Sequence, residues 1–228
     1  GHHGSATCSL SFERAPAHLI GERGEGFKHM LLLMNNARLG GGFESLGLCE
    51  AAFRMASEYA AERRSMGKTI DRHEMIADYL DEMATEIQGI RALAMNGAYH
   101  EELAQKINLH LKYAEDLGDH GREELERRQK RHAKTARRLT PLLMYLSSEK
   151  AVEMARTCVQ IHGGNGYMKE YAAEKLLRDA MVMPIYEGTS QIQSLMAMRD
   201  TLMQILKNPQ AFVRKQAQAR WRSVSARD

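Results

Sequence analysis

The sequence predicts an all-α protein built as an antiparallel helical bundle. Its composition favours helices, because four Pro and 15 Met in 228 residues, with only 6% aromatic residues, suit amphipathic helices better than strands. Apolar residues recur at helical spacing through long stretches. A convincing strand-like alternation of polar and apolar side chains occurs only at residues 7–13. The predicted fold is therefore a helical bundle preceded by one short β-strand.

Residues 1–25 are interpreted as the end of a preceding β-domain. Thr7–Glu13 has the period of a half-buried strand, and a strand needs neighbours to satisfy its backbone groups. We therefore expect the rest of its sheet to lie upstream, in a larger protein of which this chain is the C-terminal part. Gly1–Ser5 has the composition of a purification-tag remnant.

Residues 26–208 are predicted to form the bundle itself. A first helix runs from Phe27 to about Arg64, and Gly40–Gly42 interrupts its apolar face. Each glycine weakens a helix by roughly 1 kcal/mol against alanine, so we expect a kink or a close approach at this triplet. Asp71 is predicted to be the N-cap of a second helix.

A charged segment near residues 112–138 is interpreted as an insertion with a mostly solvated helix. Within it, a Gly118–Gly121 break precedes the charged helix, which is predicted at Arg122–Arg138. Thr140 and Pro141 are residue types typical of an N-cap and a first helical position, so they predict the start of a third core helix that ends at Ile161.

Shorter helices are predicted to complete the bundle. One lies near Tyr171–Ala180, and another starts at Ser190, which forms the pattern of a capping box with Gln193. Residues 209–228 are predicted to be a basic amphipathic tail.

Charge and cysteine content exclude several classes of protein. The formal charge of +3 is too small to predict a nucleic-acid partner, because its basic excess is local, at residues 122–138 and 207–222. Cys8, Cys49 and Cys158 lie far apart, so neither a zinc site nor a disulfide framework is predicted and a reducing compartment is expected. No apolar run approaches the ~20 residues that span a membrane.

Glu187 is the candidate catalytic residue. It lies at the junction before the Ser190 helix and is followed by Gly188, among apolar neighbours that could remove water from its carboxylate. A desolvated carboxylate is a better proton acceptor, which suits a general base. On local pattern alone, a surface glutamate is the competing interpretation.

The glycine-rich turn Gly163–Gly166 raises the question of nucleotide binding, since such turns let backbone N–H groups approach phosphates. It lacks the Lys-Ser/Thr of a P-loop and follows a predicted helix, so a helix C-cap is the competing interpretation. The ten histidines show no metal-binding pattern.

Four segments together resemble the acyl-CoA dehydrogenases. They are Ile20–Phe27 (IGERGEGF), Glu62–Lys68 (ERRSMGK), Gln160–Tyr167 (QIHGGNGY), and Arg178–Ala180 running on to Tyr186–Ser190 (YEGTS). The resemblance covers nearly the whole chain. It implies that Glu187 removes the α-proton of an acyl-CoA thioester while the β-hydride passes to FAD. In some relatives the base precedes the residue matching Arg38, where this chain has Ala37.

The resemblance also implies binding residues. The implied substrate-contacting positions are Asn35, Arg38 and Gly188. The implied FAD-holding positions, some of which reach a neighbouring subunit, are Arg63, His73, Glu74, Gln160, Ile161, His162, Gly163, Gly164, Thr189, Ser190 and Gln191. Departures from the family at Asn35, Met66, Glu74 and Gln191 affect the details of CoA and adenine contacts.

The resemblance implies partners as well: an electron-transfer flavoprotein as electron acceptor, and a homodimer or homotetramer. The expected location is the cytoplasm of a bacterium or the mitochondrial matrix of a eukaryote. The chain alone is expected to be inactive. Two alternatives stay open, an acyl-CoA oxidase or other flavin oxidase of the superfamily and a non-catalytic helical oligomerisation scaffold.

Overall fold

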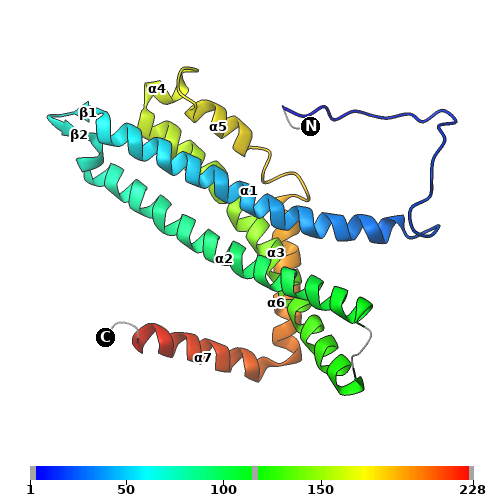
Figure 1. Cartoon of the computed structure of the whole chain (residues 1–228). Coiled ribbons are helices and arrows are strands. Elements are labelled where there is room, and N and C mark those ends of the chain that lie inside the picture. The colour runs from blue at the N-terminus through cyan, green and yellow to red at the C-terminus, as the bar shows by residue number, and fades with distance from the viewer. Residues whose placement is uncertain (1–3, 115–117, 226–228) are drawn as a thin grey trace.

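The computed structural model describes residues 4–114 and 118–225, and three long helices dominate them. They are α1 (Gly26–Glu62), α2 (Glu74–Tyr113) and α3 (Asp119–His162). Each packs against the other two, and they run in alternating directions along most of their length (Figure 1). The predicted all-α antiparallel bundle is confirmed.

The remaining elements are short or peripheral. A two-stranded hairpin of β1 (Arg64–Ser65) and β2 (Lys68–Thr69), followed by a 3₁₀ turn, connects α1 to α2. The helices after α3 are α4 (Gly164–Tyr167), α5 (Ala173–Ala180), α6 (Ser190–Lys207) and α7 (Pro209–Ser225). Of these, α5 and α6 pack on α3, whereas α7 runs away from the bundle (Figure 1).

The core lies where the three long helices meet. Small residues of α1 recur on one face at helical spacing, which lets its neighbours approach closely. The contributions to this buried cluster are Leu46, Cys49, Ala52, Ala56 and Ala60 from α1, Met83, Ile87, Ile90 and Ala94 from α2, Leu143, Ala151, Met154, Cys158 and Ile161 from α3, and Ala173 from α5. Burial raises the pKa of the Cys49 thiol to about 12 and that of Cys158 to about 11, so both remain protonated at neutral pH.

The glycine triplet in α1 makes a close approach. The helix runs through Gly40–Gly42 without interruption. A Cβ atom on Gly42 would lie 2.6 Å from Leu143 of α3, and one on Gly41 would lie 2.7 Å from the Tyr186 hydroxyl. Of the two expected outcomes, close packing therefore accounts for two of these glycines.

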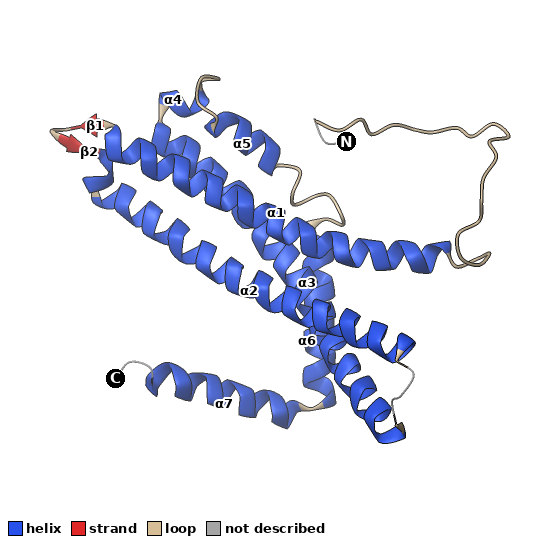
Figure 2. Cartoon of the chain, in the orientation of Figure 1, coloured by secondary structure: helices blue, strands red, loops and turns tan. Residues whose placement is uncertain are grey.

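The strand predicted at Thr7–Glu13 is wrong. These residues form exposed loop, and the described part of the chain has a sheet only in the hairpin of β1 and β2 (Figure 2). Alternating side chains make a strand only where a second strand accepts its backbone hydrogen bonds, and no described strand pairs with this segment.

Two predicted helix starts are also wrong. Asp71 lies in the 3₁₀ turn, and the residue that precedes α2 is His73, with extended backbone. Thr140 and Pro141 lie inside α3, which continues from the charged segment through Pro141 to His162. Both side chains are buried, so packing of this stretch against the other helices outweighs the hydrogen bond that proline removes. From Asp119 onward the charged segment is thus the first half of α3, whose N-cap is Gly118, while its residues 115–117 lie outside the described part of the chain.

Among the helices of residues 4–114 and 118–225, none combines the length and apolarity required to cross a membrane.

Candidate active site at the junction before α6

Glu187 lies on a strained turn between α5 and α6. Its φ of 56° is in the left-handed region, which costs a residue with a side chain about 1 kcal/mol or more. Gly188 follows with φ 102°, and the Ser190 N–H donates to the Pro184 carbonyl at 2.8 Å, closing the turn. The prediction that Glu187 lies at a junction and outside the helix is confirmed.

Side chains from two helices hold the carbonyls of this turn. Arg38 of α1 donates from Nε to the Glu187 carbonyl at 3.1 Å. Gln193 of α6 donates from Nε2 to the same carbonyl at 2.8 Å and to the Gly188 carbonyl at 3.3 Å. Gln193 is only 1% exposed, so these hydrogen bonds are shielded from water. The turn is thereby fixed relative to both α1 and α6.

The predicted capping box of Ser190 and Gln193 does not form. Helix α6 starts at Ser190 itself, one residue earlier than a capping box requires, and the Gln193 N–H donates to the Thr189 carbonyl at 3.0 Å. The Gln193 side chain instead reaches back beyond the helix to the carbonyls of Glu187 and Gly188. It positions the turn, a role that sequence reasoning missed.

Buried oxygens without partners gather at this junction. Among the described residues, three of the six buried side-chain atoms that lack a hydrogen bond are Glu187 Oε2, Ser190 Oγ and Gln193 Oε1. Each of these oxygens can accept a hydrogen bond, and burying an acceptor without a donor is costly unless a bound molecule supplies one. The arrangement is suited to take a proton from a bound molecule.

Tyr186 ties the same turn to α1. Its hydroxyl donates to Glu44 Oε2 at 2.8 Å. Burial, with the hydrogen bond to Glu44 and the charges of Glu44 and Glu187, raises the pKa of Tyr186 well above its usual value, so the phenol stays protonated at neutral pH. Glu44 was not predicted as a site residue, because its link to Tyr186 spans 142 positions and no local pattern reveals it.

The predicted substrate-contacting residues come together beside Glu187. Arg38 Nη1 lies 3.4 Å from Asn35 Oδ1 while its Nε holds the Glu187 carbonyl, so Asn35, Arg38 and Gly188 form one neighbourhood. A cavity of about 310 Å³ lies among α1, α2, α3 and α6, and it is bordered by Asn35, Arg38 and Met196 but not by Glu187 or Gly188. Arg38 is therefore the residue that this cavity and the turn share.

The predicted FAD positions fall into two groups. Thr189, Ser190 and Gln191 start α6, near Arg38. Arg63, His73, Glu74 and the turn after α3 lie at the other end of α1, because His162 stacks on Tyr59 with ring centroids 4.2 Å apart. Arg38 and Arg63 are 25 residues apart, which is about 37 Å along a helix. One chain does not bring the two groups together.

The two groups offer different chemistry to a cofactor. At the start of α6, backbone N–H groups and the unpartnered Ser190 Oγ fit an anionic or polar ligand. At the other end, Gly163 takes φ 60° as the cap of α3, and Gly163 and Gly164 are exposed with nothing within 4 Å of a Cβ position, so a ligand can approach their backbone closely. The C-cap interpretation of this turn is confirmed, and it is compatible with binding.

Some predicted FAD positions are occupied by structural contacts. Ile161 and His162 are buried, and His162 Nδ1 lies 2.8 Å from the Cys158 carbonyl. His73 Nε2 lies 3.1 Å from the Ser65 carbonyl of the hairpin. The exposed predicted positions at this end of the bundle are Arg63, Glu74, Gln160, Gly163 and Gly164, so a ligand would meet these first.

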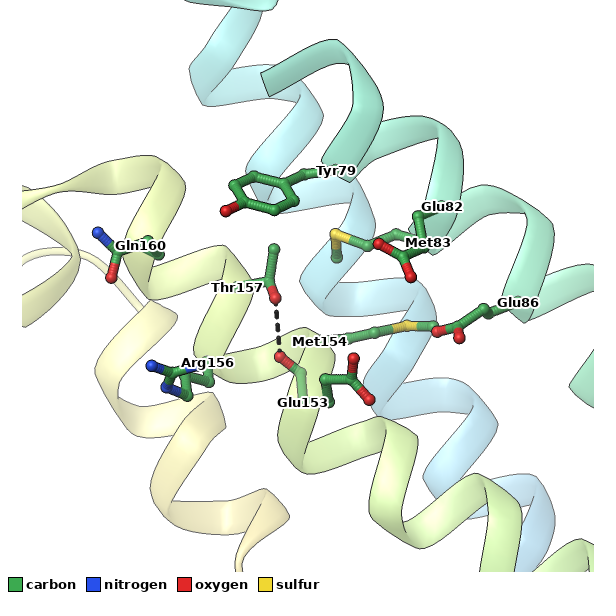
Figure 3. A pocket seen from close by; sticks show the side chains of 9 residues that line it. All are labelled: Tyr79, Glu82, Met83, Glu86, Glu153, Met154, Arg156, Thr157 and Gln160. Atoms are coloured by element: carbon green, nitrogen blue, oxygen red, sulfur yellow. Dashed lines mark hydrogen bonds between the residues drawn. The ribbon is translucent and has the colours of Figure 1, made fainter. Parts of the chain in front are cut away.

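Gln160 also borders a second cavity, of about 280 Å³, between α2 and α3 (Figure 3). Glu82 and Glu86 of α2 face Glu153 of α3 across it. Lys150 pairs with Glu86 and with Glu153, the latter at 2.8 Å. Burial alone would lower the pKa of Lys150, but its hydrogen bonds to Glu153 and Glu86 outweigh burial and raise that pKa.

Within the described residues, no group of three or more His, Cys, Asp or Glu is arranged to hold a metal ion.

The fold and the junction define a class of protein: a helical domain that presents a buried carboxylate oxygen without a described partner, on a turn held by two of its helices. Comparison with known proteins identifies the family. The model of the acyl-CoA dehydrogenase C-terminal domain matches residues 24–114 and 122–202. The chain belongs to the acyl-CoA dehydrogenase family and carries its C-terminal helical domain.

Individual relatives agree with this assignment. An acyl-CoA dehydrogenase of Bacillus subtilis (strain 168) is 36% identical over 198 residues, which cover 86% of this chain and 45% of that protein. An acryloyl-CoA reductase (NADH) of Anaerotignum propionicum is 34% identical over 202 residues, 87% of this chain and 44% of that protein. The chain spans less than half the length of these curated relatives.

Solved structures share the fold. Butyryl-CoA dehydrogenase from Megasphaera elsdenii superposes with a TM-score of 0.63 at 27% identity, over 80% of this chain and 40% of that one. A structure described as an electron transferring flavoprotein of Acidaminococcus fermentans gives a TM-score of 0.64 at 27% identity, with the same coverage.

Proposed function

We propose that this chain supplies the acid–base residue for FAD-dependent α,β-dehydrogenation of an acyl-CoA thioester, with Glu187 as the base. The observation that carries the proposal is the buried Oε2 atom of Glu187, which has no hydrogen-bond donor among the described residues and lies on a turn held from two sides. The family assignment supports the substrate class.

In this mechanism Glu187 accepts the α-proton of the thioester as the α-carbon–hydrogen bond breaks. The chemistry that FAD supplies when bound is acceptance of the β-hydrogen with its electron pair, which leaves a double bond between the two carbons. Arg38 and Gln193 keep the Glu187 backbone in place by donating to its carbonyl. The hydrogen bond from Tyr186, the residue before Glu187, to Glu44 anchors the turn to α1. These contacts orient the carboxylate before substrate arrives.

The residues that would hold FAD are those at the start of α6 and those around Gly163. Because the two groups lie at opposite ends of α1, we propose that each flavin site combines one group from this chain with the other group from a second copy. A homodimer or homotetramer would then be required for a complete site.

The same residues can run the reaction backwards. The acryloyl-CoA reductase of Anaerotignum propionicum is named for reduction, and its similarity to this chain favours a second candidate function, the reduction of an enoyl-CoA. Glu187 would then donate the α-proton. Measuring turnover from both the acyl-CoA and the enoyl-CoA side separates the two directions.

The proposed electron partner is an electron-transfer flavoprotein. A relative named as a subunit of a caffeyl-CoA reductase–Etf complex, from Acetobacterium woodii, is 32% identical over 176 residues. Dependence of turnover on such a partner would support this proposal. Peroxide formation by the full-length protein at the rate of substrate turnover would favour the oxidase alternative instead.

Glu187→Gln in the full-length protein tests the central proposal. General bases contribute typically 10²–10⁴-fold, so we expect flavin bleaching by an acyl-CoA to slow by at least about a hundredfold. Glu58→Gln, at an exposed position of α1, is the matched control and should leave the rate unchanged. Unchanged dehydrogenation by the Glu187 variant would refute the assignment and favour the non-catalytic scaffold.

We also propose that the chain alone is inactive and binds no stoichiometric flavin. Gln160, Gly163 and Gly164 are exposed, so these flavin-holding positions have no described protein surface over them. A colourless preparation of the purified chain is expected, and a flavin absorption spectrum at one flavin per chain would contradict this.

A further inference from the structure

Helix α7 stands apart from the bundle. It follows α6 across Asn208, whose side-chain oxygen accepts from the Ala211 N–H at 3.0 Å and caps the helix. Every residue of α7 except Ala211 is exposed, and the helix points away from α1, α2 and α3 (Figure 1). A helix of this length is marginal on its own in water, so its exposed face is expected to have a partner.

One side of α7 is apolar. Val213, Ala217, Trp221 and Val224 are spaced by four, four and three residues, which places them within about 80° of arc on the helix. The large members of this strip are open to solvent, with Val213 66%, Trp221 77% and Val224 68% exposed. Such an arrangement exposes a continuous apolar strip that includes an aromatic ring with a polar N–H.

The charges around this strip have a single sign. Residues 201–225 contain five basic side chains, and no Asp or Glu. Arg214 and Arg220 flank the apolar strip, one on either side, while Lys215 and Arg222 lie on the opposite face. Long basic side chains beside an apolar strip can bury their stems and keep their charges at a polar boundary.

We propose that α7 lies on the surface of an anionic lipid membrane, with the strip of Val213, Ala217, Trp221 and Val224 inserted among the headgroups. An apolar face with flanking basic residues and an interfacial tryptophan fits such a surface in shape and in charge. Pairing of α7 with the same helix of a second copy fits poorly, because it would place the flanking arginines of both copies side by side. The proposal does not depend on the catalytic role of Glu187.

The chain provides its own probe, since Trp221 is its only tryptophan. Vesicles of phosphatidylcholine with phosphatidylglycerol, added to the whole chain at low salt, are expected to shift Trp221 emission to the blue and to sediment with the protein. Vesicles of phosphatidylcholine alone are expected to do neither to a comparable degree. High salt should reverse binding to the anionic vesicles, because it screens the basic residues.

Two double variants separate surface insertion from general attraction. Arg214→Gln with Arg220→Gln removes the flanking charges, and each charge near an anionic surface contributes about fivefold, so binding should weaken by about 25-fold. Lys215→Gln with Arg222→Gln makes the same charge change on the far face, where the distance approaches a Debye length of about 10 Å, and should weaken binding less.

Several outcomes would overturn the proposal. They are the absence of any emission shift with anionic vesicles, equal weakening by both double variants, and equal binding to neutral vesicles. A blue shift that follows protein concentration without lipid would identify a second copy as the partner. Capture of α7 by an acidic peptide such as poly-glutamate, with a blue shift that anionic vesicles fail to produce, would identify a protein partner.

Discussion

The strained backbone at Glu187 is held by side chains that lie far away in sequence. Arg38, 149 positions earlier, and Gln193, six positions later, donate to the same carbonyl. Gly188 is required in this arrangement, because its φ of 102° is rarely adopted by other residues and a Cβ atom there would lie 2.9 Å from Gln193 Nε2. The catalytic proposal for Glu187 therefore depends on its supporting residues as much as on its carboxylate.

Replacing Gln193 by leucine tests this support. The change keeps the side-chain bulk but leaves the Gly188 carbonyl without this donor and the Glu187 carbonyl with Arg38 alone. We expect the variant to lose about 1–3 kcal/mol of unfolding free energy in urea. Gln88→Leu, at an exposed position of α2, is the control and should change stability much less. Equal effects would show that the hydrogen bonds of Gln193 do not stabilise the turn.

The sequence predicted Glu187 as the functional acid and located it correctly before a helix. It did not predict how the turn is held. The capping-box pattern assigned Gln193 to Ser190, whereas the start of α6 one residue earlier leaves the Gln193 side chain for the carbonyls of Glu187 and Gly188. The hydrogen-bond partners of the Gln193 side chain depend on how the turn packs against α1, and a local sequence pattern does not reveal that packing.

At the scale of elements, long apolar periodicity predicted α1 almost to the residue, while local helix signals failed at Asp71 and at Pro141. Proline weakens a helix interior by about 3 kcal/mol, yet burial of Leu139, Thr140, Pro141 and Leu143 against the other helices provides enough packing to keep α3 continuous. Tertiary burial overrides a local signal for a helix start, and that burial is visible only once the helices are assembled.

The glycine triplet provides a matched comparison within one helix. Gly42→Ala would place a methyl group 2.6 Å from the buried Leu143, and we expect this overpacking to destabilise the fold by about 1–3 kcal/mol. Gly40→Ala meets nothing within 4 Å and should stabilise α1 by up to about 1 kcal/mol. Urea unfolding of both variants measures the difference, and changes of the same sign would contradict the close approach of α1 and α3.

The pair of His100 and His132 couples α2 to α3 and makes that contact sensitive to pH. Their Nδ1 atoms lie 2.8 Å apart, so one ring donates and the other must be an unprotonated acceptor. Burial lowers the pKa of both; the charges of Arg131 and Arg138 add to this at His100, and those of His100, Arg131 and Arg128 at His132. A lowered pKa means that the unfolded chain takes up protons first as pH falls below about 6.5, so the stability that is present at neutral pH declines.

His132→Leu tests this pH dependence. We expect the unfolding free energy of the unchanged chain to fall between about pH 7.5 and pH 5.5, and the variant to show a shallower fall. His110→Gln, at an exposed position of α2, serves as the control and should keep the original slope. The same slope in the His132 variant and the unchanged chain would show that the pair does not titrate in this range.

At the scale of the whole molecule, large apolar side chains are exposed along one face of α6. Helix α6 packs on α3, yet Ile192, Leu195, Leu202 and Leu206 recur along its other face and are exposed. An apolar strip of this kind marks an association surface. The separation of the two candidate flavin groups along α1 independently favours a second copy.

We therefore expect the chain to self-associate through this face of α6. Leu195→Glu with Leu202→Glu would place four like charges in a two-fold interface, so the variant should sediment as a monomer in the analytical ultracentrifuge at concentrations where the unchanged chain is a dimer or larger. Met95→Glu with Leu109→Glu makes an equivalent change on exposed positions of α2 and should leave the assembly intact. If both variants dissociate alike, or if the unchanged chain is monomeric, α6 does not form the interface, and the two groups of flavin-holding residues must be joined in another way.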